Sequence, residues 1–426
     1  MVNRARFYET PTALANALAS YVPSTARRIL DPCTGNGALL RPLHGRKAEF
    51  FAADIRAAAI ATTIAELKFG RKLVVHTGDF LRMDLRSWAG QMDCVVMNPP
   101  FSGKKQAMIA LREFAPRTHV TLETGFILRG IKCLRPGGRL VAIVPPSIVC
   151  GDQMASLRRE LTILGAVSLV HELPPFTFPR VESRVYILVF DLNPVRRASI
   201  TLLNHSLLQP EKLVLSARSA QDGTRLDFGF HAANQVLLGL KARKNLGWGS
   251  LEHKYSVLRV TLSSPQGVEK GVHTIDADGP MWRLHRSLRP MTTKDASPLL
   301  RASDLLIKRV SRDAVETCGL ARNCLNMPWT DCVFALRPKH LTDEIGAMFL
   351  IRVMLGLPFT EELFGKSAGA SFLRKKDLET LPIPWEFLPK ISSLLGRYRR
   401  AVTDENRSKI LQLELDARIA LKRLCR

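Results

Sequence analysis

Long apolar runs are absent from this chain of 426 residues, since no stretch approaches the roughly 20 uninterrupted apolar residues that a membrane-spanning helix needs. The segment 1–11 is basic and lacks an apolar core, which argues against a secretory signal. Eight cysteines are scattered without a framework spacing, so we expect reduced thiols and not a disulfide scaffold. Together these absences predict a cytoplasmic protein without a membrane partner.

Acidic residues are scarce as well. The chain has 38 Asp and Glu against 62 Lys and Arg, which gives a formal net charge of +24 at pH 7. A hydrophobic content of 46% suits ordinary folded domains and excludes disorder as a description of the whole chain. The excess of positive charge predicts an anionic partner, and nucleic acid is the first candidate because each neutralised phosphate releases counterions. A membrane surface is the weaker alternative, since no strongly basic amphipathic helix stands out.

Short apolar runs alternate with helix-like segments through the first 200 residues. Runs of strand length occur at 28–30, 50–53, 73–75, 94–97, 140–144, 167–170 and 185–190. Helix-like segments between them include 57–67 and 123–134. Near-continuous Val, Ile and Leu runs that alternate with helices are typical of a parallel sheet covered on both faces. We therefore predict an α/β fold with a Rossmann-like doubly wound sheet, in which the last two strands form an antiparallel edge.

The pattern changes after residue 200. Residues 201–245 have mixed character with one helix-like segment at 232–242, which predicts a connector. Residues 246–390 contain four of the five tryptophans and short apolar pieces broken by Gly, Pro and Ser, which predicts a smaller mixed α/β or β-rich domain. Residues 391–426 have helical periodicity and form the predicted tail. The first 200 residues are thus the predicted catalytic domain.

Three segments at predicted strand ends carry residues that suit a small ligand. In Asp31-Pro32-Cys33-Thr34-Gly35-Asn36-Gly37, the glycines let the backbone turn and approach a ligand closely, and a helix expected from Ala38 would favour an acidic group at its N-terminus. The spacing does not match the Gly-x-Gly-x-x-Gly pattern of dinucleotide sites. Asp54 can accept both hydrogen bonds of a ribose diol, or it can cap a helix. Asp79-Phe80 can hold an adenine ring, or it can form a turn.

The most specific motif is Asn98-Pro99-Pro100-Phe101, which follows the fourth predicted strand. Prolines fix the backbone and remove N–H donors, so their carbonyls are available as acceptors beside the Asn98 amide oxygen. Two acceptors on one exocyclic amino group draw its nitrogen toward a tetrahedral geometry and expose its lone pair. Phe101 offers a ring on which an extruded base can stack. The alternative is a structural Pro-Pro turn beside a core phenylalanine.

With these motifs the chain resembles the S-adenosylmethionine-dependent N6-adenine DNA methyltransferases of the gamma order, close in plan to the TaqI-type enzymes. The resemblance implies that S-adenosyl-L-methionine is the cofactor. The methionine part of this cofactor would contact Thr10, in the segment Tyr8-Glu9-Thr10-Pro11, and the loop after the first predicted strand. The residues that the resemblance assigns to the cofactor are Thr10, Asp31, Cys33, Gly35, Asp54, Ile55, Asp79, Phe80 and Asn98.

The same resemblance makes Asn98, Pro99, Pro100 and Phe101 the catalytic tetrapeptide. Phe178, which precedes Pro179 between the last two strands, is similar to the aromatic residue that stacks on the other face of the flipped adenine. Many members of the family have Tyr where this chain has Phe101. Stacking needs only the ring, so this difference does not put the activity in doubt.

The C-terminal region is similar to target-recognition domains of restriction–modification proteins, with residues 367–384 resembling their closing segment. Residues 283–312 hold eight Lys and Arg against two Asp, which suits phosphates and guanine edges but also a solvated surface. Cys318, Cys324, Cys332 and His340 lack a Cys-x-x-Cys pair, so we predict free thiols and no metal.

We therefore expect a site-specific, adenine-specific DNA methyltransferase acting on N6 of a flipped-out adenine. Double-stranded DNA is the expected partner, with a restriction nuclease or a defence protein as a further one. Two alternatives stay open. Similar tetrapeptides serve RNA and protein N-methyltransferases, although the large basic C-terminal half argues against a protein substrate. The chain could also be the recognition or modification subunit of a restriction or defence system.

Overall fold

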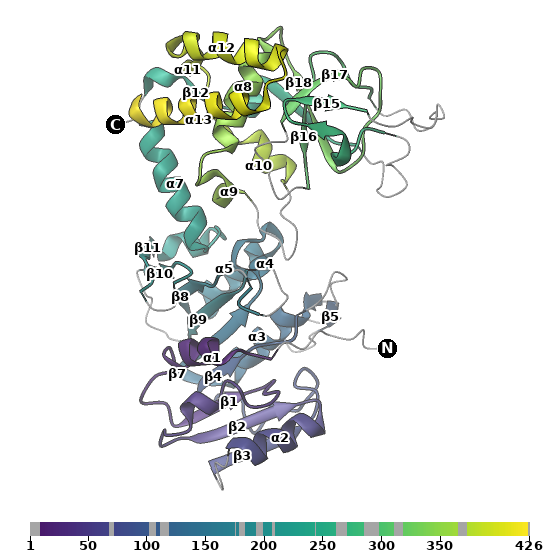
Figure 1. The fold of residues 1–426 in the computed structure, drawn as a ribbon. Coiled ribbons are helices and arrows are strands. Elements are labelled where there is room, and N and C mark those ends of the chain that lie inside the picture. Colours follow the sequence, from purple (N-terminus) through teal and green to yellow (C-terminus); the bar gives the residue numbers. More distant parts are fainter. Residues whose placement is uncertain are drawn as a thin grey trace. The chain divides into compact units, whose positions relative to one another are not determined.

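The computed structural model describes residues 9–67, 72–101, 108–110, 119–174, 176–178, 184–192, 199–206, 209–242, 244–260, 271–284, 298–310, 318–364 and 373–424. These residues form two compact units, one ending at His231 and the other beginning at Ala232 (Figure 1). The boundary lies within helix α7 (Phe228–Lys241). It falls inside the segment 201–245 that the sequence predicts as a connector.

The first unit is built around a sheet that has nine strands among the described residues, in the order β11-β10-β8-β9-β7-β4-β1-β2-β3. Its strands are β1 (Arg28–Asp31), β2 (Glu49–Asp54), β3 (Leu73–Thr77), β4 (Met92–Met97), β7 (Leu134–Val144), β8 (Ala166–Glu172), β9 (Tyr186–Asp191), β10 (Ser199–Leu203) and β11 (Lys212–Ser216). A separate short pair joins β5 (Met108–Ala110) to β6 (His119–Thr121). The helices are α1 (Thr12–Ala19), α2 (Ala57–Leu67), α3 (Leu122–Cys133), α4 (Pro146–Cys150), α5 (Ala155–Leu164), α6 (Ala217–Gln221) and α7, with 3-10 turns η1 (Arg41–Leu43) and η3 (Asp152–Met154).

Because the strands that carry the motifs run in the same direction, the polar residues at their carboxyl ends lie at the same end of this sheet. β1 pairs in parallel with β2 and β4, and β4 pairs in parallel with β7. β9 is antiparallel to both β7 and β8, so β8 runs in the same direction as β4. The predicted antiparallel pair is therefore present. It does not form the edge of the sheet, because β9 lies between β7 and β8 and two further strands, β10 and β11, lie beyond β8.

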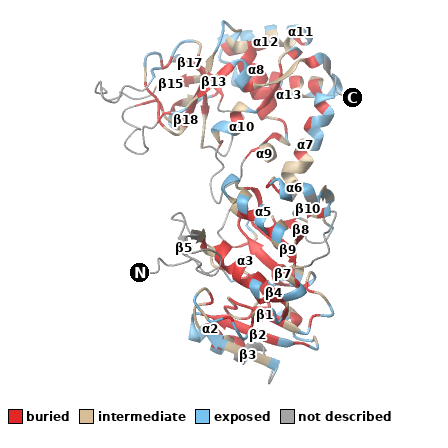
Figure 2. Ribbon diagram, turned by 180° about the vertical axis from the view of Figure 1, so that it is seen from behind, coloured by how far each residue is buried: buried red, intermediate tan, exposed pale blue. Residues whose placement is uncertain are grey.

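Both faces of the central strands of the sheet are buried. Along β4, Cys94 and Val96 belong to a hydrophobic core cluster shared with α1, whereas Val95 and Met97 belong to a second cluster shared with α3 and α5. Figure 2 shows the central strands of the sheet largely in red, the colour of buried residues. Side chains of a strand alternate between the two faces, so a continuous apolar run is what a sheet covered on both sides requires. The predicted doubly wound α/β fold with a further domain is confirmed.

One predicted helix is wrong. The sequence predicts a helix from Ala38, but the structure has turns followed by the 3-10 turn η1. Pro42 lies inside this segment and has no N–H with which to continue an α-helical ladder, and Gly45 ends it soon afterwards. The loop after β1 therefore has no α-helix N-terminus to stabilise an acidic ligand group.

The second unit combines strands with helices. Among the described residues, six strands form a sheet in the order β13-β18-β16-β17-β15-β14, and β12 pairs with β19. The strands are β12 (Trp248–Ser250), β13 (Tyr255–Leu258), β14 (Ala277–Asp278), β15 (Met281–Arg283), β16 (Leu305–Lys308), β17 (Gly319–Asn323), β18 (Val333–Pro338) and β19 (Pro382–Pro384). The helices are α8 (Glu344–Leu355), α9 (Thr360–Leu363), α10 (Lys375–Glu379), α11 (Phe387–Lys390), α12 (Ser392–Thr403) and α13 (Arg407–Leu424), with 3-10 turns η4 (Lys244–Leu246), η5 (Leu251–His253) and η6 (Thr274–Asp276).

The two tail helices α12 and α13 share one hydrophobic core with α8 and the strands of the second unit. Inside this core, Arg352 of α8 donates to Glu414 of α13 over 2.5 Å, and the hydroxyl of Tyr398 donates to the same carboxylate over 3.0 Å. The side chains of Arg352 and Glu414 are 1% and 0% exposed. The tail is therefore part of the second unit and is fixed there by buried charge.

Candidate functional site

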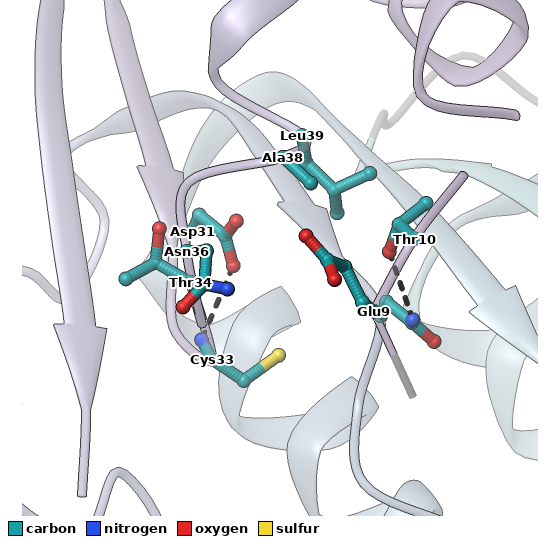
Figure 3. A pocket seen from close by; sticks show the side chains of 9 residues that line it. Glu9, Thr10, Asp31, Cys33, Thr34, Asn36, Ala38 and Leu39 are labelled. Atoms are coloured by element: carbon teal, nitrogen blue, oxygen red, sulfur yellow. Dashed lines mark hydrogen bonds between the residues drawn. The ribbon is translucent and has the colours of Figure 1, made fainter. Parts of the chain in front are cut away.

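A pocket lies at the carboxyl end of β1 in the first unit, where the chain enters the loop that the sequence marks out (Figure 3). It is lined by Glu9, Thr10, Asp31, Cys33, Thr34, Asn36, Ala38, Leu39 and Asn98. Four predicted site residues, Thr10, Asp31, Cys33 and Asn98, are thus brought together from three separate parts of the chain. Parallel pairing of β1 with β4 explains this, because the two strands end at the same edge.

Asn98 is held by the segment that precedes α1. Its side-chain nitrogen donates a hydrogen bond of 3.0 Å to the hydroxyl of Thr10. Thr10 is buried, and Pro11 after it caps α1, whose Leu14 and Leu18 pack in the core. The bond commits the amide nitrogen of Asn98 to Thr10 and thereby sets the orientation of the amide oxygen. The N-terminal segment and the tetrapeptide therefore belong to one site.

Asp31 is a buried carboxyl at the bottom of this pocket. It is 1% exposed, and it accepts a hydrogen bond of 3.2 Å from the backbone N–H of Cys33 (Figure 3). Burial raises the pKa of Asp31 to about 7; the Cys33 N–H opposes this shift and the nearby charge of Asp54 adds to it. The pKa of the Cys33 thiol is raised by burial and by the same two carboxylates, so the thiol stays neutral.

Asp54 ties the end of β2 to the loop after β1. One of its oxygens accepts a hydrogen bond of 2.9 Å from the backbone N–H of Gly35, whose φ of 52° is a conformation that glycine adopts without strain. The other accepts from the backbone N–H and from the Nε of Arg56, at 2.9 and 3.1 Å. The side chain of Ile55 beside it is exposed. Asp54 thus braces the loop, and a ribose diol would have to replace part of its bonding to Arg56.

The predicted adenine contact lies just after β3. The Asp79 carboxylate accepts a hydrogen bond of 3.0 Å from the backbone N–H of Leu81 and forms an ion pair with Arg82. Phe80 is buried, and its ring stacks on Phe126 with centroids 5.6 Å apart. Phe80 is therefore a core residue in this structure, and its contact with an adenine ring stays a prediction.

Of the aromatic residues predicted to hold a base, Phe101 follows β4 and Phe178 lies in the loop between β8 and β9. Pro99 is buried, whereas Pro100 and Phe101 are half-buried. Phe101 packs against the core cluster that contains Phe178, which is 2% exposed. The structure thus joins Phe101 and Phe178 through one cluster.

Two residues escaped the sequence-based assignment. Glu9 lines the pocket, and Figure 3 shows its carboxyl group pointing into the space that Asp31 also borders. Phe176 is 60% exposed and lies two residues before Phe178. The position of Glu9 next to Thr10 could have suggested the first. Nothing in the local sequence distinguishes Phe176 from Phe178, because both are phenylalanines of the same short segment.

The chemistry of this pocket suits a ligand that carries an ammonium group. Among the described residues, neither Glu9 nor Asp31 forms an ion pair with a Lys, Arg or His side chain. A buried carboxyl that has no cation of its own is costly once ionised and gains most from a cationic ligand. Metal ligation has no comparable support, since the described residues contain no group of three or more His, Cys, Asp or Glu side chains placed to hold an ion.

Residues 3–220 match the family described as N-6 DNA Methylase, which is more than half of the chain. This chain belongs to the N-6 DNA methylase family. The match spans the pocket, the tetrapeptide and all nine strands of the first sheet. The matched residues thus include the strands of the first unit and the residues that line the pocket.

Similarities to individual proteins extend this picture. The type IIG restriction endonuclease BpuSI is similar over 99% of this N-6 DNA methylase and 66% of its own chain, with 13% identity and a TM-score of 0.51. A type I restriction–modification methyltransferase subunit from Streptococcus thermophilus matches over 47% of this chain and 48% of its own, with 18% identity and a TM-score of 0.42. At 13% identity, the similarity to BpuSI shows a shared fold and nothing more.

A curated relative is the defense against restriction protein B of Escherichia phage P1. It is 32% identical over 138 residues, which are 32% of this N-6 DNA methylase and 6% of the phage protein. The chain therefore spans a small part of that relative and about half of the first similar solved structure.

The C-terminal segments singled out in the sequence are only partly among the described residues. Residues 285–297 and 311–312 of the basic run, and residues 367–372 of the closing segment, lie outside the described residues. The described remainder of the closing segment includes β19, which pairs with β12. Cys318 and Cys324 are buried in two different core clusters of the second unit.

Proposed function

We propose that this N-6 DNA methylase is a site-specific DNA methyltransferase that moves a methyl group from S-adenosyl-L-methionine to N6 of a flipped-out adenine. The observation that carries the proposal is the hydrogen bond of 3.0 Å between Asn98 and Thr10, in a pocket that also contains the buried carboxyl of Asp31. It unites the tetrapeptide that would hold the adenine with the residues that would hold the cofactor.

Different residues would bind different parts of the cofactor. S-adenosyl-L-methionine would supply a methyl group on a sulfonium centre. Asp31 and Glu9 would accept hydrogen bonds from its α-ammonium group, which gives the two carboxylates the cation they lack among the described residues. Asp54 would bind the ribose diol beside Ile55, and Asp79 with Phe80 would contact the adenine ring. Cys33 and Gly35 would line the methionine part.

The tetrapeptide would act on the substrate amino group without a strong base. The amide oxygen of Asn98 and the carbonyl of Pro99 would accept its two N–H bonds, which localises the nitrogen lone pair for in-line attack on the methyl carbon. The cofactor would supply the methyl group with its sulfur as the leaving group, and the extra proton on the methylated nitrogen would pass to water. Phe101 and Phe178 would hold the extruded base, while Pro100 fixes the turn.

Double-stranded DNA is the proposed partner. A net charge of +24 favours a polyanion, and residues 246–390 are proposed to read the target sequence. The relatives described as restriction or anti-restriction proteins support a role in such a system, with a nuclease or defence protein as a further partner. We place this activity in the cytoplasm, where DNA is accessible. None of the helices in the described residues is long and apolar enough to cross a bilayer.

The experiment that tests this function compares three substrates. Wild-type protein and the Asn98→Ala variant are incubated with labelled cofactor and duplex DNA, RNA or protein in parallel, and methylated bases are mapped in DNA from cells expressing each. We expect incorporation into duplex DNA, at adenine, in one sequence context, and only with Asn98 present. Incorporation into RNA or protein would overturn the DNA assignment and favour the alternative substrates. Methylation at cytosine would overturn the adenine assignment.

A further inference from the structure

The loop between β8 and β9 presents a large aromatic side chain to solvent. Phe176 is 60% exposed, whereas Phe178 in the same loop is 2% exposed and belongs to the core. An exposed aromatic side chain forgoes the free energy of burial, which it gains when another molecule covers it. The loop therefore has one aromatic residue in the core and one that is open to solvent.

The backbone at Phe176 supports this distinction. The backbone N–H of Thr177 donates to the carbonyl of Pro174 over 3.3 Å, and its hydroxyl donates to the same carbonyl over 2.5 Å. Phe176 is the third residue of the resulting four-residue turn and has a φ of 61°. Turns with a positive φ at this position favour Gly or Asn. A Phe here accepts backbone strain, which is typical of functional positions.

The turn is braced on both sides. At its base the backbone N–H of Leu173 donates to the carbonyl of Val185 over 2.9 Å. Glu172 accepts from Arg184 over 2.5 Å and from the backbone N–H of Gly229 over 3.2 Å, which joins both ends of the loop to the start of α7. The side chain of Glu172 is 3% exposed. Hydrogen bonds therefore hold both ends of the loop that carries the exposed ring.

Strand direction places this loop on the functional edge. β8 runs in the same direction as β4, so its carboxyl end, where the turn begins, lies at the sheet edge where Asn98 comes directly after β4. Phe101 packs against the cluster that contains Phe178, whereas Phe176 belongs to none of the core clusters of the described residues. Phe176 thus lies outside the group proposed to hold the extruded base.

We propose that Phe176 is a wedge that inserts into the DNA duplex and fills the space that the extruded adenine leaves. This inference rests on the proposed DNA methyltransferase function. Extrusion costs the stacking of the target base, and an apolar ring inserted between the neighbouring base pairs restores part of it. A solvent-exposed ring on a hydrogen-bonded turn suits this role, because insertion covers apolar surface that the free protein exposes.

Abasic DNA distinguishes a wedge from a residue that stacks on the extruded base. Binding of wild-type protein and Phe176→Ala is measured by fluorescence anisotropy, at fixed salt, on duplexes that carry the mapped site with either adenine or an abasic site at the target. A wedge still stacks on the flanking pairs of the abasic duplex, so Phe176→Ala should weaken binding to both duplexes roughly tenfold. If the variant loses affinity only for the duplex with adenine, Phe176 stacks on the extruded base and the wedge is overturned.

Two matched variants complete the test. Phe176→Trp keeps an aromatic ring and should retain wild-type affinity for both duplexes. Ile163 is also strongly exposed, at the end of α5 just before β8 begins and hence near the opposite edge, so Ile163→Ala should change nothing. Equal effects of Ile163→Ala and Phe176→Ala would overturn the proposal. A wild-type protein that methylates no DNA would remove the proposed function itself, whereas a methylating wild type with an unaffected Phe176→Ala would remove only the wedge.

Discussion

Asn98 and Thr10 lie 88 positions apart in the sequence, and their side chains are joined by a hydrogen bond of 3.0 Å in which the Asn98 amide donates. The bond fixes the orientation of the amide, and we propose that the amide oxygen accepts from the substrate amino group. Thr10 is therefore a positioning residue for Asn98. Its hydroxyl, and not its bulk, is the part that matters.

Removing the Asn98 amide should abolish most of the chemistry while sparing the cofactor. The acceptor strengthens only as the amino nitrogen becomes tetrahedral, so Asn98→Ala should slow single-turnover methyl transfer by about 10²–10³-fold. Thr10→Val should slow it less, and Thr10→Ser should restore it because the hydroxyl is kept. Near-normal transfer by a folded Asn98→Ala protein would return the tetrapeptide to a structural turn.

Cofactor binding should depend on pH through Asp31. Because its pKa is raised to about 7, Asp31 is largely protonated below that pH and attracts an ammonium group poorly. Affinity should therefore rise as the pH approaches 7, with release of a proton on binding, and fall again above the ordinary α-amino pKa of about 7.7–8.0. Calorimetry in buffers of different ionisation enthalpy measures the proton. Asp31→Asn should remove the acidic limb, and an unchanged profile in that variant would contradict the assignment.

The same carboxyl has a predictable effect on stability. Its pKa rises from 3.8 to about 7 on folding, so the folded protein binds more protons than the unfolded chain between these values. The contribution of Asp31 to stability is fully present below the lower value and is lost as the pH rises through about 7. In urea unfolding, the free energy of unfolding of the wild type should therefore fall relative to that of Asp31→Asn as the pH rises from 4 to 8.

Much of the first unit can be predicted from local sequence, because the central strands of its sheet are buried on both faces. The run at 94–97 contributes Cys94 and Val96 to one face and Val95 and Met97 to the other, so both faces needed apolar residues and the strand was visible in the sequence. The helix predicted at 57–67 is α2. Motif residues at strand ends meet because parallel strands share an edge.

Long-range and conformational features were not predictable in this way. The insertion of β9 between β7 and β8 depends on sheet pairing across the chain. Phe176 is exposed and Phe178 is buried, although both are phenylalanines of the same short segment. The bond of Glu414 to Arg352 joins residues 62 positions apart, and no local pattern marks either as buried. Each of these features is decided by packing between distant segments.

Asp54 should matter to both the loop and the cofactor. Asp54→Ala removes the acceptor for Gly35 and for the proposed ribose diol, so affinity for the cofactor should fall roughly 10- to 100-fold. Arg56→Ala is the matched control. It removes the guanidinium from Asp54 but keeps the backbone N–H of position 56 and the Gly35 bond, so it should preserve or strengthen binding. Calorimetry that finds equal affinity for wild type and folded Asp54→Ala would exclude the ribose role.

The strain at Phe176 can be measured separately from any DNA contact. Phe176→Ala and Phe176→Gly both remove the ring, but only glycine adopts a φ of 61° without a steric cost. The glycine variant should therefore be more stable to urea than the alanine variant, by about 1 kcal/mol. Equal stabilities would mean that the turn relaxes when the ring is removed.

The pair Arg352–Glu414 should govern the stability of the second unit. Both side chains are buried, and Arg352 also donates to the carbonyl of Cys318 over 2.8 Å. Glu414→Ala leaves a buried guanidinium without its carboxylate, so we expect a loss of about 3–5 kcal/mol in the free energy of unfolding. Four of the five tryptophans lie in this unit, so their fluorescence during urea unfolding reports its transition.

A double replacement separates the lost partner from the lost charge. Arg352→Met combined with Glu414→Leu removes both charges and keeps apolar volume, and such replacements are often neutral or stabilising. The double variant should therefore recover most of the stability that Glu414→Ala loses. Cofactor affinity, which depends on the first unit, should stay at the wild-type value in both variants. If the double variant is as unstable as Glu414→Ala, the carboxylate contributes through its ion pair with Arg418 or its hydrogen bond with Tyr398, and not through its pairing with Arg352.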